Sequence, residues 1–513
     1  MILVIHNTLK VVSVLNDEDN VVIEYDINKS IAQNLYETAT NYPEEIIVWC
    51  LDEVEKLIDK EYIKTTFRSN RKFISYNPYK NYLPDAIGYI EESPFININK
   101  EVKYSTWQMT SLVGAVRAST LLLIEADFWN RNVSFDYTLN SIAKNYQPFG
   151  LFCESDPNLI IQKVELPQQD VAGFSELFQF VKEHYKLIWS FLLFFNLFIY
   201  EKKWRFVNLF STLFHSRIKI KDIKLNFTEF INNEDKDKVD VIIPTIGRKK
   251  YLYDFLCDLK KQILLPVNVI IVEQNPLPDS HSELEFLKDE NWPFVIKHTF
   301  THQTGACNAR NIALNKVESE WCFLADDDIR IEPAFLKEGL TNINQLDVGA
   351  AVFNCFQKDE VHFYTKIAQT IIFGSGCSIF NREKYKHVYF DEKLEFGFGE
   401  DIEYGMQLRN GGCNVVYLPE PTILHLKAPI GGFRTKFQHP WANDKIKPKP
   451  SPTIMYVKKK YLSKKQILGY RTVLFLKFYK VQNVKNPFVY FLNFKKQWKV
   501  SENWALKLKK NEV

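Results

Sequence analysis

The sequence lacks an apolar run long enough to cross a bilayer, which takes about 20 mainly apolar residues. Its longest apolar run, Leu187 to Tyr200, is interrupted by Ser190 and Asn196. We expect this run to form a buried or interdomain helix, and a helix lying in a membrane surface is the alternative. A secretory leader is also lacking, because Met1 opens a short apolar strand with no basic segment or cleavage site. We therefore expect a cytoplasmic protein.

Paired cysteines and an excess of one charge are lacking as well. The eight cysteines form no CxxC pair and no zinc-ribbon spacing, so we expect reduced thiols in the core. The formal net charge is only +3, but from Lys445 onward 18 Lys and Arg face only Glu502 and Glu512. This basic segment favours contact with anionic lipid, with a plain solvated surface as the alternative. It carries no recognisable nucleic-acid-binding motif, so we expect no nucleic-acid partner.

With 513 residues, 46% of them hydrophobic and 25% charged, the chain has the size and composition of two or three globular domains. The polar segment 232–238 contains no apolar residue and predicts a domain boundary. The expected division is an N-terminal α/β domain (1–170), a helical linker region (171–235), a catalytic α/β domain (236–440) and a basic helical extension (441–513).

The segment after this boundary has the order strand, loop, helix, strand. Val239 to Ile243 reads as a strand, Leu252 to Leu259 carry a one-face apolar stripe, and Val267 to Val272 reads as the next strand. Such a βαβ unit forms a parallel sheet with its ligand crevice at the carboxyl ends of the strands. Polar residues that follow these strands are therefore candidates for a functional site.

Three consecutive acids, Asp326, Asp327 and Asp328, directly follow the buried strand Trp321 to Ala325. Crowded carboxylates repel one another, which raises their pKa values unless a cation neutralises them. Mg²⁺ and Mn²⁺ prefer carboxylate oxygens and take phosphate oxygens as further ligands. A solvated acidic turn or a helix N-cap would explain an isolated triplet. The position at the end of a central parallel strand favours a metal site.

Two further groups of polar residues lie downstream. Gly397-Phe-Gly-Glu-Asp401 places two acids at the start of a predicted helix, where a carboxylate in a cleft can act as general base. Helix capping alone is the alternative. His425 ends a predicted strand, and its neutral imidazole could complete a metal site begun by Asp328.

These motifs, in this order over residues 241–425, resemble the family-two glycosyltransferases of GT-A fold. The segments that carry the resemblance are Val241-Ile-Ile-Pro-Thr-Ile-Gly-Arg248, Val272-Glu-Gln-Asn275, Gly305-Ala-Cys-Asn-Ala-Arg-Asn311, Leu324-Ala-Asp-Asp-Asp328, Phe398-Gly-Glu-Asp401 and Ile423-Leu-His425.

The resemblance implies an inverting transfer of a sugar from a nucleotide-diphosphate sugar to an acceptor hydroxyl, with Mn²⁺ or Mg²⁺ as cofactor. It implies Asp401 as catalytic base, Glu400 and Gly376 on the acceptor side, and Asp328 and His425 as metal ligands. The implied donor-binding residues are Pro244, Thr245, Arg248, Glu273, Arg310, Asp326 and Asp327. Thr-Ile-Gly-Arg in place of Thr-Tyr-Asn-Arg, and Glu273-Gln-Asn in place of paired acids, leave the donor base open.

The N-terminal part alternates strand-like and helix-like runs, including strands at 21–25 and 120–124 and a helix at 54–60. Ser111 to Arg117 weakly resembles the acceptor-side segment of the same fold. A catalytically silent GT-A-like domain and an unrelated α/β module both remain open.

The expected acceptor is a glycan or lipid-linked glycan at the inner face of the cytoplasmic membrane. A sugar-phosphate nucleotidyltransferase is one alternative, but its Gly-rich phosphate loop is not evident in Pro244 to Arg248. A non-catalytic glycan-binding scaffold is the other.

Overall fold

The computed structural model describes residues 1–19, 21–161, 170–221, 223, 225, 237–361, 364–429 and 437–511. The chain divides into two compact units. The first unit comprises Met1–Glu229 with Leu462–Phe478, and the second comprises Phe230–Tyr461 with Tyr479–Val513. Most of the predicted boundary segment, residues 232–236, lies outside the described residues, and the four-part division stays a prediction.

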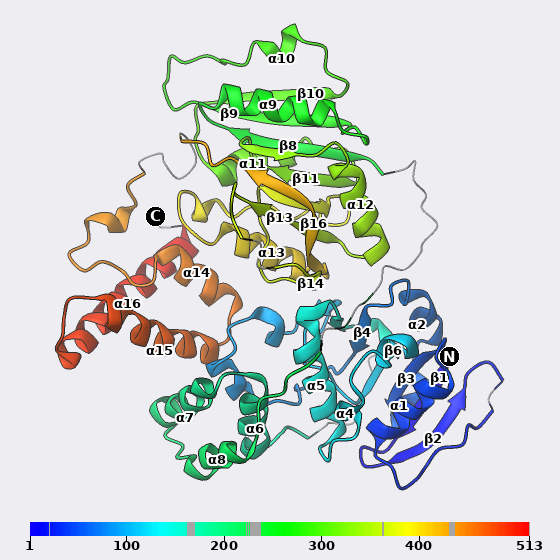
Figure 1. The fold of residues 1–513 in the computed structure, drawn as a ribbon. Coiled ribbons are helices and arrows are strands. Elements are labelled where there is room, and N and C mark those ends of the chain that lie inside the picture. Colours follow the sequence, from blue (N-terminus) through cyan, green and yellow to red (C-terminus); the bar gives the residue numbers. More distant parts are fainter. Residues whose placement is uncertain are drawn as a thin grey trace. The chain divides into compact units, whose positions relative to one another are not determined.

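The described part of the second unit contains a nine-stranded sheet, in which β8 lies between β9 and β11 (Figure 1). The strands β10, β9, β8 and β11 run parallel, whereas β15 is antiparallel to both β11 and β13. In sheet order the strands are β10 (Val295–Thr301), β9 (Asn268–Gln274), β8 (Val239–Thr245), β11 (Trp321–Ala325), β15 (Cys377–Asn381), β13 (Ala350–Phe356), β16 (Val415–His425) and β12 (Ile329–Ile331), with β14 (Ala368–Gln369) paired to β16.

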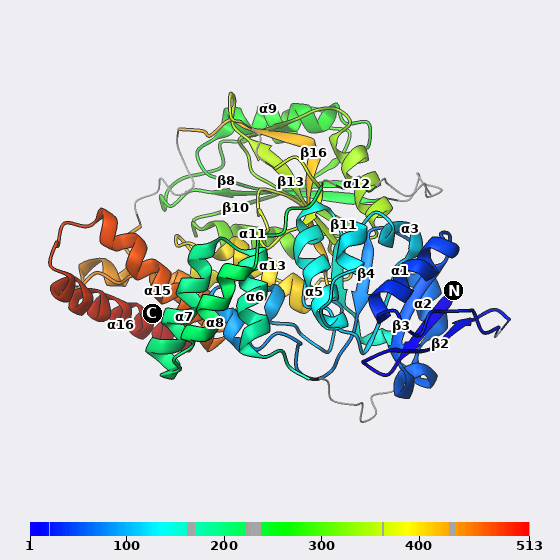
Figure 2. The ribbon, with the colours of Figure 1, turned by 60° about the horizontal axis from the view of Figure 1, so that its bottom comes forward.

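Helices cover both faces of this sheet. Figure 2 shows α9 (Lys249–Lys260) and α12 (Phe335–Leu346) on one face and α11 (Ala306–Leu314) and α13 (Glu400–Asn410) on the other. The predicted apolar stripe of α9 is buried, which explains how this helix packs. The remaining elements of the unit are α10 (Phe286–Asp289), η7 (Glu392–Leu394), η9 (Pro440–Asn443), α14 (Pro452–Tyr461) and α16 (Pro487–Lys510).

The first unit has, in its described part, a seven-stranded sheet. In sheet order its strands are β2 (Val11–Asn16), β1 (Ile2–His6), β3 (Ile46–Leu51), β6 (Val113–Arg117), β4 (Lys72–Ser75), β7 (Phe152–Ser155) and β5 (Tyr104–Ser105). Its helices are α1 (Ile31–Asn41), η1 (Asp52–Leu57), α2 (Lys60–Thr66), η2 (Asp85–Tyr89), η3 (Pro94–Ile96), α3 (Ala118–Leu121), α4 (Ala126–Trp129), α5 (Phe135–Tyr146), η4 (Gln147–Phe149), η5 (Pro157–Leu159), α6 (Phe174–His184), α7 (Leu187–Glu201), α8 (Phe206–Ser211) and η6 (Thr212–Phe214). Most of α15 (Lys464–Val481) also belongs to this unit.

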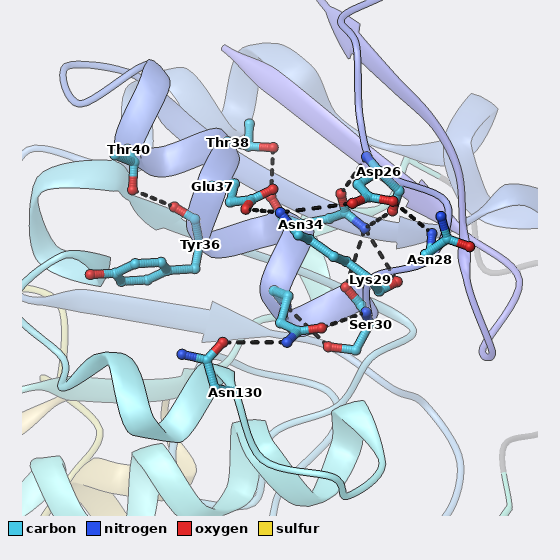
Figure 3. A network of polar contacts seen from close by, with 11 residues as sticks. Asp26, Asn28, Lys29, Ser30, Asn34, Tyr36, Glu37, Thr38, Thr40 and Asn130 are labelled. Atoms are coloured by element: carbon cyan, nitrogen blue, oxygen red, sulfur yellow. Dashed lines mark hydrogen bonds and ion pairs between the residues drawn. The ribbon is translucent and has the colours of Figure 1, made fainter.

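Local hydrogen bonds explain why α1 begins where it does. Ser30 and Gln33 form a reciprocal capping box, with Gln33 N–H donating to Ser30 Oγ at 3.2 Å. Figure 3 shows Asn34 beside the preceding loop, where its side chain exchanges two hydrogen bonds with the backbone of Asp26. The side chains around the first turn therefore fix the entry of the chain into the helix.

Three sequence-based expectations for local structure were wrong. Residues 120–124 were expected as a strand, but α3 ends at Leu121 and a turn follows. Residues 21–25 form only an isolated bridge at Val22, and the expected helix at 54–60 is the 3₁₀ helix η1 followed by α2. None of the eight cysteines, all within the described residues, forms a disulfide, but Cys355 is exposed rather than in the core.

Six strands of the first unit repeat the arrangement of six strands of the second. The order β1-β3-β6-β4-β7-β5 corresponds to β8-β11-β15-β13-β16-β14. Every neighbouring pair has the same direction in both units: parallel for the first pair, antiparallel for the next two, parallel for the fourth and antiparallel for the last. The helices α1, α2 and α5 also occupy the same places in the chain order as α11, α12 and α13.

The strand registers agree residue by residue as well. If Val113 is aligned with Cys377, then Cys50 aligns with Ala325, because Cys50 pairs with Val113 in one sheet and Ala325 pairs with Cys377 in the other. The same alignment, followed from strand to strand, matches Ser75–Gly114 with Val352–Ser378, Phe73–Cys153 with Ala350–Val415, and Tyr104–Ser155 with Ala368–Tyr417. The two sheets therefore share one plan down to single residues.

Candidate active site

A cavity of about 470 Å³ opens at the carboxyl ends of β8 and β11 in the second unit. After β8 the chain crosses to β9 on one side, whereas β11 pairs with β8 on the other side, so the cavity lies at a topological switch point of the sheet. The predicted site residues that line it are Pro244, Thr245, Arg248, Arg310, Asp326, Asp327, Asp328, Gly376, Glu400, Asp401 and His425.

Glu273 is the one predicted site residue that is absent from this lining among the described residues. Its carboxylate is 3.0 Å from Nε2 of His298 and accepts a hydrogen bond from the backbone N–H of Glu283. The next residue, Gln274, does line the cavity, and its side-chain oxygen accepts from the Gly305 N–H at 2.6 Å. The structure thus brings Gln274, rather than Glu273, to the cavity wall.

Asp327 joins the loop after β8 to the acidic triplet. Its Oδ2 accepts from Thr245 Oγ1 at 2.7 Å and its Oδ1 from Arg248 at 2.6 Å. Burial raises the pKa of Asp327 to about 6, although Arg248 and Thr245 oppose the shift. Because both carboxylate oxygens are engaged, this side chain fixes the cavity wall.

Asp326, Asp328 and His425 form a potential metal site. One ligand atom from each lies within 4.8 Å of the other two. Two carboxylates and an imidazole suit Mn²⁺, and the remaining positions would be left for water and phosphate oxygens. The donor set therefore fits the cofactor predicted from the sequence, and Asp326 joins the two predicted ligands.

The surroundings of Asp328 keep it ionised. Burial alone would raise its pKa, but the hydrogen bonds from His425 and the Ala428 N–H and the charge of Arg248 outweigh burial and hold the pKa at about 2. The Ala428 N–H donates to Oδ2 at 2.7 Å, and His425 Nε2 lies 3.3 Å from Oδ1. The same hydrogen bond raises the pKa of His425. A deprotonated carboxylate is the form that a cation requires.

Arg310 and Gly376 determine where Asp326 points. The Arg310 guanidinium donates to Asp326 Oδ1 at 3.0 Å from α11. A Cβ atom on Gly376 would lie 2.2 Å from Asp326 Oδ2, so only glycine allows this approach. The Asp326 carboxylate is thus held between the Arg310 guanidinium and the backbone of Gly376.

Glu400 and Asp401 lie in the first turn of α13, where the helix dipole favours negative charge. Gly399 precedes them with φ of 111°, a backbone conformation that favours glycine. The Asp401 carboxylate accepts from the backbone N–H of Ser375 at 3.1 Å. Burial, and then the charge of Asp401, raise the pKa of Glu400 to about 7, and burial also raises that of Asp401. Two carboxyl groups with raised pKa values in a cleft are suited to proton transfer.

Two residues outside the sequence-based set support the site. Glu395 lines the cavity and accepts hydrogen bonds from the N–H groups of Cys307 and Asn308, at the start of α11. Thr453, fully buried in α14, accepts from the Phe398 N–H at 3.2 Å and so holds the loop that leads into α13. Neither residue belongs to a recognisable motif, and each acts on a segment at least 50 residues away in the chain.

The comparison with protein families agrees with this geometry. Residues 240–400 match the family described as Glycosyl transferase family 2. The matched residues lie in the second unit, whose catalytic-domain region is thus of the family-2 glycosyltransferase type. No curated protein matches the chain.

Several solved structures are similar to the chain. Residues 1–349 of S. aureus TarS in complex with UDP share 20% identity with a TM-score of 0.33, and the match covers 37% of this chain and 61% of that one. The same TarS fragment with UDP-GlcNAc gives 17% identity and a TM-score of 0.38 over 53% of this chain and 81% of that one. GalNAc-T7 with UDP, GalNAc and Mn²⁺ gives 13% identity and a TM-score of 0.36 over 44% and 49%.

Proposed function

We propose that the second unit is an inverting, metal-dependent glycosyltransferase that moves a sugar from a nucleotide-diphosphate sugar to an acceptor hydroxyl. The observation that carries this proposal is the meeting, in one cavity, of a three-residue ligand set (Asp326, Asp328 and His425) with a carboxylate at a helix start (Asp401). An inverting transfer needs these two parts, one at the leaving diphosphate and one at the attacking hydroxyl.

Asp328 and His425, joined by Asp326, would hold Mn²⁺ or Mg²⁺. The bound cation would neutralise the charge that develops on the leaving diphosphate. Pro244, Thr245 and Arg248 would bind the nucleotide, with Asp327 holding Thr245 and Arg248 in place. Arg310 would lie near the donor sugar, on the side where Asp326 is clamped.

Asp401 would take the proton from the acceptor hydroxyl as the sugar bond forms. Its hydrogen bond to Ser375 orients the carboxylate, and burial makes it more basic. Glu400 and Gly376 would contact the acceptor. We propose a glycan or lipid-linked glycan as the acceptor, as in surface-glycan synthesis at the inner face of the cytoplasmic membrane.

The test is release of nucleoside diphosphate from a panel of UDP-, GDP- and dTDP-sugars with Mn²⁺ or Mg²⁺. We expect release from one donor, dependent on metal and lost in Asp401→Asn and Asp328→Ala. The acceptor half of the proposal is tested by sugar incorporation into glycan extracts, with the configuration of the new linkage determined by NMR. Absence of both nucleotide release and metal-dependent nucleotide binding would overturn the proposal in favour of a scaffold.

For the first unit we propose a second GT-A-like copy in which the donor site is closed. By the shared register, Leu51 stands where the second unit has Asp326, and Leu112 where it has Gly376. Both leucines are buried. Apolar side chains thus replace one of the proposed cation ligands and the bare backbone beside it, and we expect this to weaken the affinity for a metal-bound diphosphate.

The proposed base has a counterpart in the first unit. Asp136 is the second residue of α5, as Asp401 is of α13, and it accepts from the Ser111 N–H at 2.8 Å, as Asp401 does from Ser375. Ser111 Oγ also donates to the other carboxylate oxygen of Asp136 at 2.7 Å, and the Ser375 side chain likewise hydrogen-bonds to Asp401. The preceding residue is Phe135, whose ring packs edge-on against buried His6. Asp136 therefore serves the packing of the unit.

Nucleotide-binding stoichiometry tests this part of the proposal. Calorimetry with the donor nucleotide and Mn²⁺ should give one site per chain, abolished by Asp328→Ala and unchanged by Asp136→Asn. Two sites, or binding that survives in Asp328→Ala, would assign nucleotide binding to the first unit and overturn its closed state.

A further inference from the structure

The helix α7 buries its polar side chains and exposes apolar ones. Its two polar interruptions, Ser190 and Asn196, are fully buried. Asn196 accepts a hydrogen bond from Thr472 of α15 at 2.6 Å and donates to the Tyr89 carbonyl. The outward positions are apolar instead: Ile188, Phe191, Phe195 and Ile199 are 57%, 39%, 49% and 47% exposed. In an ordinary surface helix, the polar residues face the solvent and the apolar residues face the core.

The exposed apolar surface continues onto the next helix. Trp204 packs between Phe198 and Phe206, with ring centroids at 4.1 and 5.4 Å, and so joins the end of α7 to the start of α8. No residue of α8 is buried. Figures 1 and 2 show α7 and α8 as neighbours within the first unit. The exposed side chains that continue the surface are Trp204, Phe206, Val207, Phe210, Leu213 and Phe214. We call the outward side chains of 187–214 the α7–α8 surface.

The chain segment that carries this surface is rich in positive charge. From residue 185 to residue 221 the only acid is Glu201, and it accepts hydrogen bonds from Lys203 and Tyr89. The basic residues of the same stretch are Lys186, Lys202, Lys203, Arg205, Arg217, Lys219 and Lys221. An apolar strip beside Lys and Arg, with an exposed Trp, matches the interface of an anionic bilayer, where acyl chains lie beneath negative headgroups.

The dimensions favour lying on the membrane over crossing it. α7 has 15 residues, or roughly 22 Å of helix, against a hydrocarbon core of about 30 Å. In the described part of the chain no helix is long and apolar enough to span a bilayer. A contiguous apolar surface of this extent marks an interaction site on a folded protein.

We propose that the α7–α8 surface binds the surface of an anionic phospholipid membrane. The outward apolar side chains enter the boundary between headgroups and acyl chains, and the flanking Lys and Arg contact the phosphates. Membrane binding of this kind does not depend on the proposed glycosyl transfer, although it would bring the enzyme to a lipid-linked acceptor.

Vesicle flotation tests the proposal with the full chain. We expect the protein to float with phosphatidylcholine vesicles that contain phosphatidylglycerol, and to bind pure phosphatidylcholine more weakly. Phe210→Glu combined with Phe214→Glu should weaken binding roughly tenfold or more, because two exposed aromatic side chains lose their transfer into the membrane. Arg217→Gln combined with Lys219→Gln and Lys221→Gln should weaken the preference for the anionic lipid, because three of the seven basic residues lose their charge.

The matched control is Phe488→Glu with Leu492→Glu on α16, whose side chains are 81% and 55% exposed. This variant changes the basic C-terminal extension instead and should bind vesicles like the wild type. Mn²⁺-dependent nucleotide binding should persist in every variant, which separates loss of membrane binding from misfolding. Failure of the wild type to float, or loss of flotation in the α16 variant alone, would overturn the proposal. A dimer in sedimentation that dissociates in Phe210→Glu with Phe214→Glu would also overturn the proposal, because a second copy of the chain would then cover the surface.

Discussion

The Asp401 carboxylate is tied to the backbone N–H of Ser375, the residue that precedes Gly376, at 3.1 Å. One short segment before β15 therefore positions both the predicted base and, through Gly376, the carboxylate of Asp326. The first unit has the first relationship, between Asp136 and Ser111, but not the second, because Leu112 stands in the place of the glycine. The hydrogen bond is thus common to both units, whereas the glycine is present only beside the acidic triplet of the second unit.

Substitution of Asp328 should weaken metal binding more than substitution of its neighbour Asp327. Asp328→Ala removes a charged ligand, and we expect Mn²⁺ affinity, measured by electron paramagnetic resonance, to fall by roughly tenfold or more. Asp327→Asn is the matched control, since both oxygens of Asp327 already accept from Thr245 and Arg248. Equal losses in the two variants would show that the triplet attracts the cation through bulk charge alone.

Gly376→Ala should impair donor binding. The added Cβ would meet Asp326 Oδ2 at 2.2 Å, so the carboxylate must leave its place beside Arg310. We expect nucleotide affinity to fall roughly tenfold, from a strain of one to two kcal/mol. The control is Gly173→Ala in the first unit, where a Cβ finds its nearest neighbour at 3.9 Å. Unchanged calorimetric affinity in Gly376→Ala would contradict the proposed position of the diphosphate.

Thr453 should affect turnover more than donor binding, because it holds the loop that carries the proposed base. Thr453→Val keeps the shape but removes the acceptor for the Phe398 N–H, and kcat should fall about tenfold while the nucleotide Kd stays constant. Thr453→Ser retains the hydroxyl and should restore kcat. A parallel loss of kcat and nucleotide affinity in the valine variant would indicate a general loss of structure instead.

The sequence was sufficient where local pattern decides the structure. The apolar strand Trp321 to Ala325 was predicted with its observed bounds, and with it the position of the acidic triplet. The role of Glu273 was harder to foresee, because His298 is 25 residues away in the chain and becomes its neighbour only when β9 and β10 pair.

The correspondence of the two sheets lay beyond sequence reasoning for a related reason. It rests on strand pairing, and the residues that occupy the shared positions differ in chemistry, as Leu51 and Asp326 do. Thr453 illustrates the same limit, since a single hydroxyl in a helix of ordinary composition gives no signal until the loop it holds is known.

Glu400 should make the protein less stable at high pH. Its pKa is raised from 4.5 to about 7 in the folded protein. Ionisation of Glu400 is therefore less favourable in the folded state than in the unfolded chain, and it lowers the free energy of unfolding. This cost is absent below pH 4.5, grows as the pH rises and is complete above about 7. Glu400→Gln removes this cost. The Tm of the variant should therefore exceed that of the wild type at pH 8, by about 2–4 °C for each kcal/mol of cost, and should differ little near pH 5.

Scanning calorimetry of both proteins at the two pH values measures this difference. The matched control is Glu338→Gln, which changes an exposed glutamate in the first turn of α12 and should give the same small Tm change at both pH values. A Glu400→Gln variant whose Tm difference from the wild type does not depend on pH would show that Glu400 is not held in a costly charged state. Its contact with the acceptor, rather than the field of Asp401, would then have to account for any effect on catalysis.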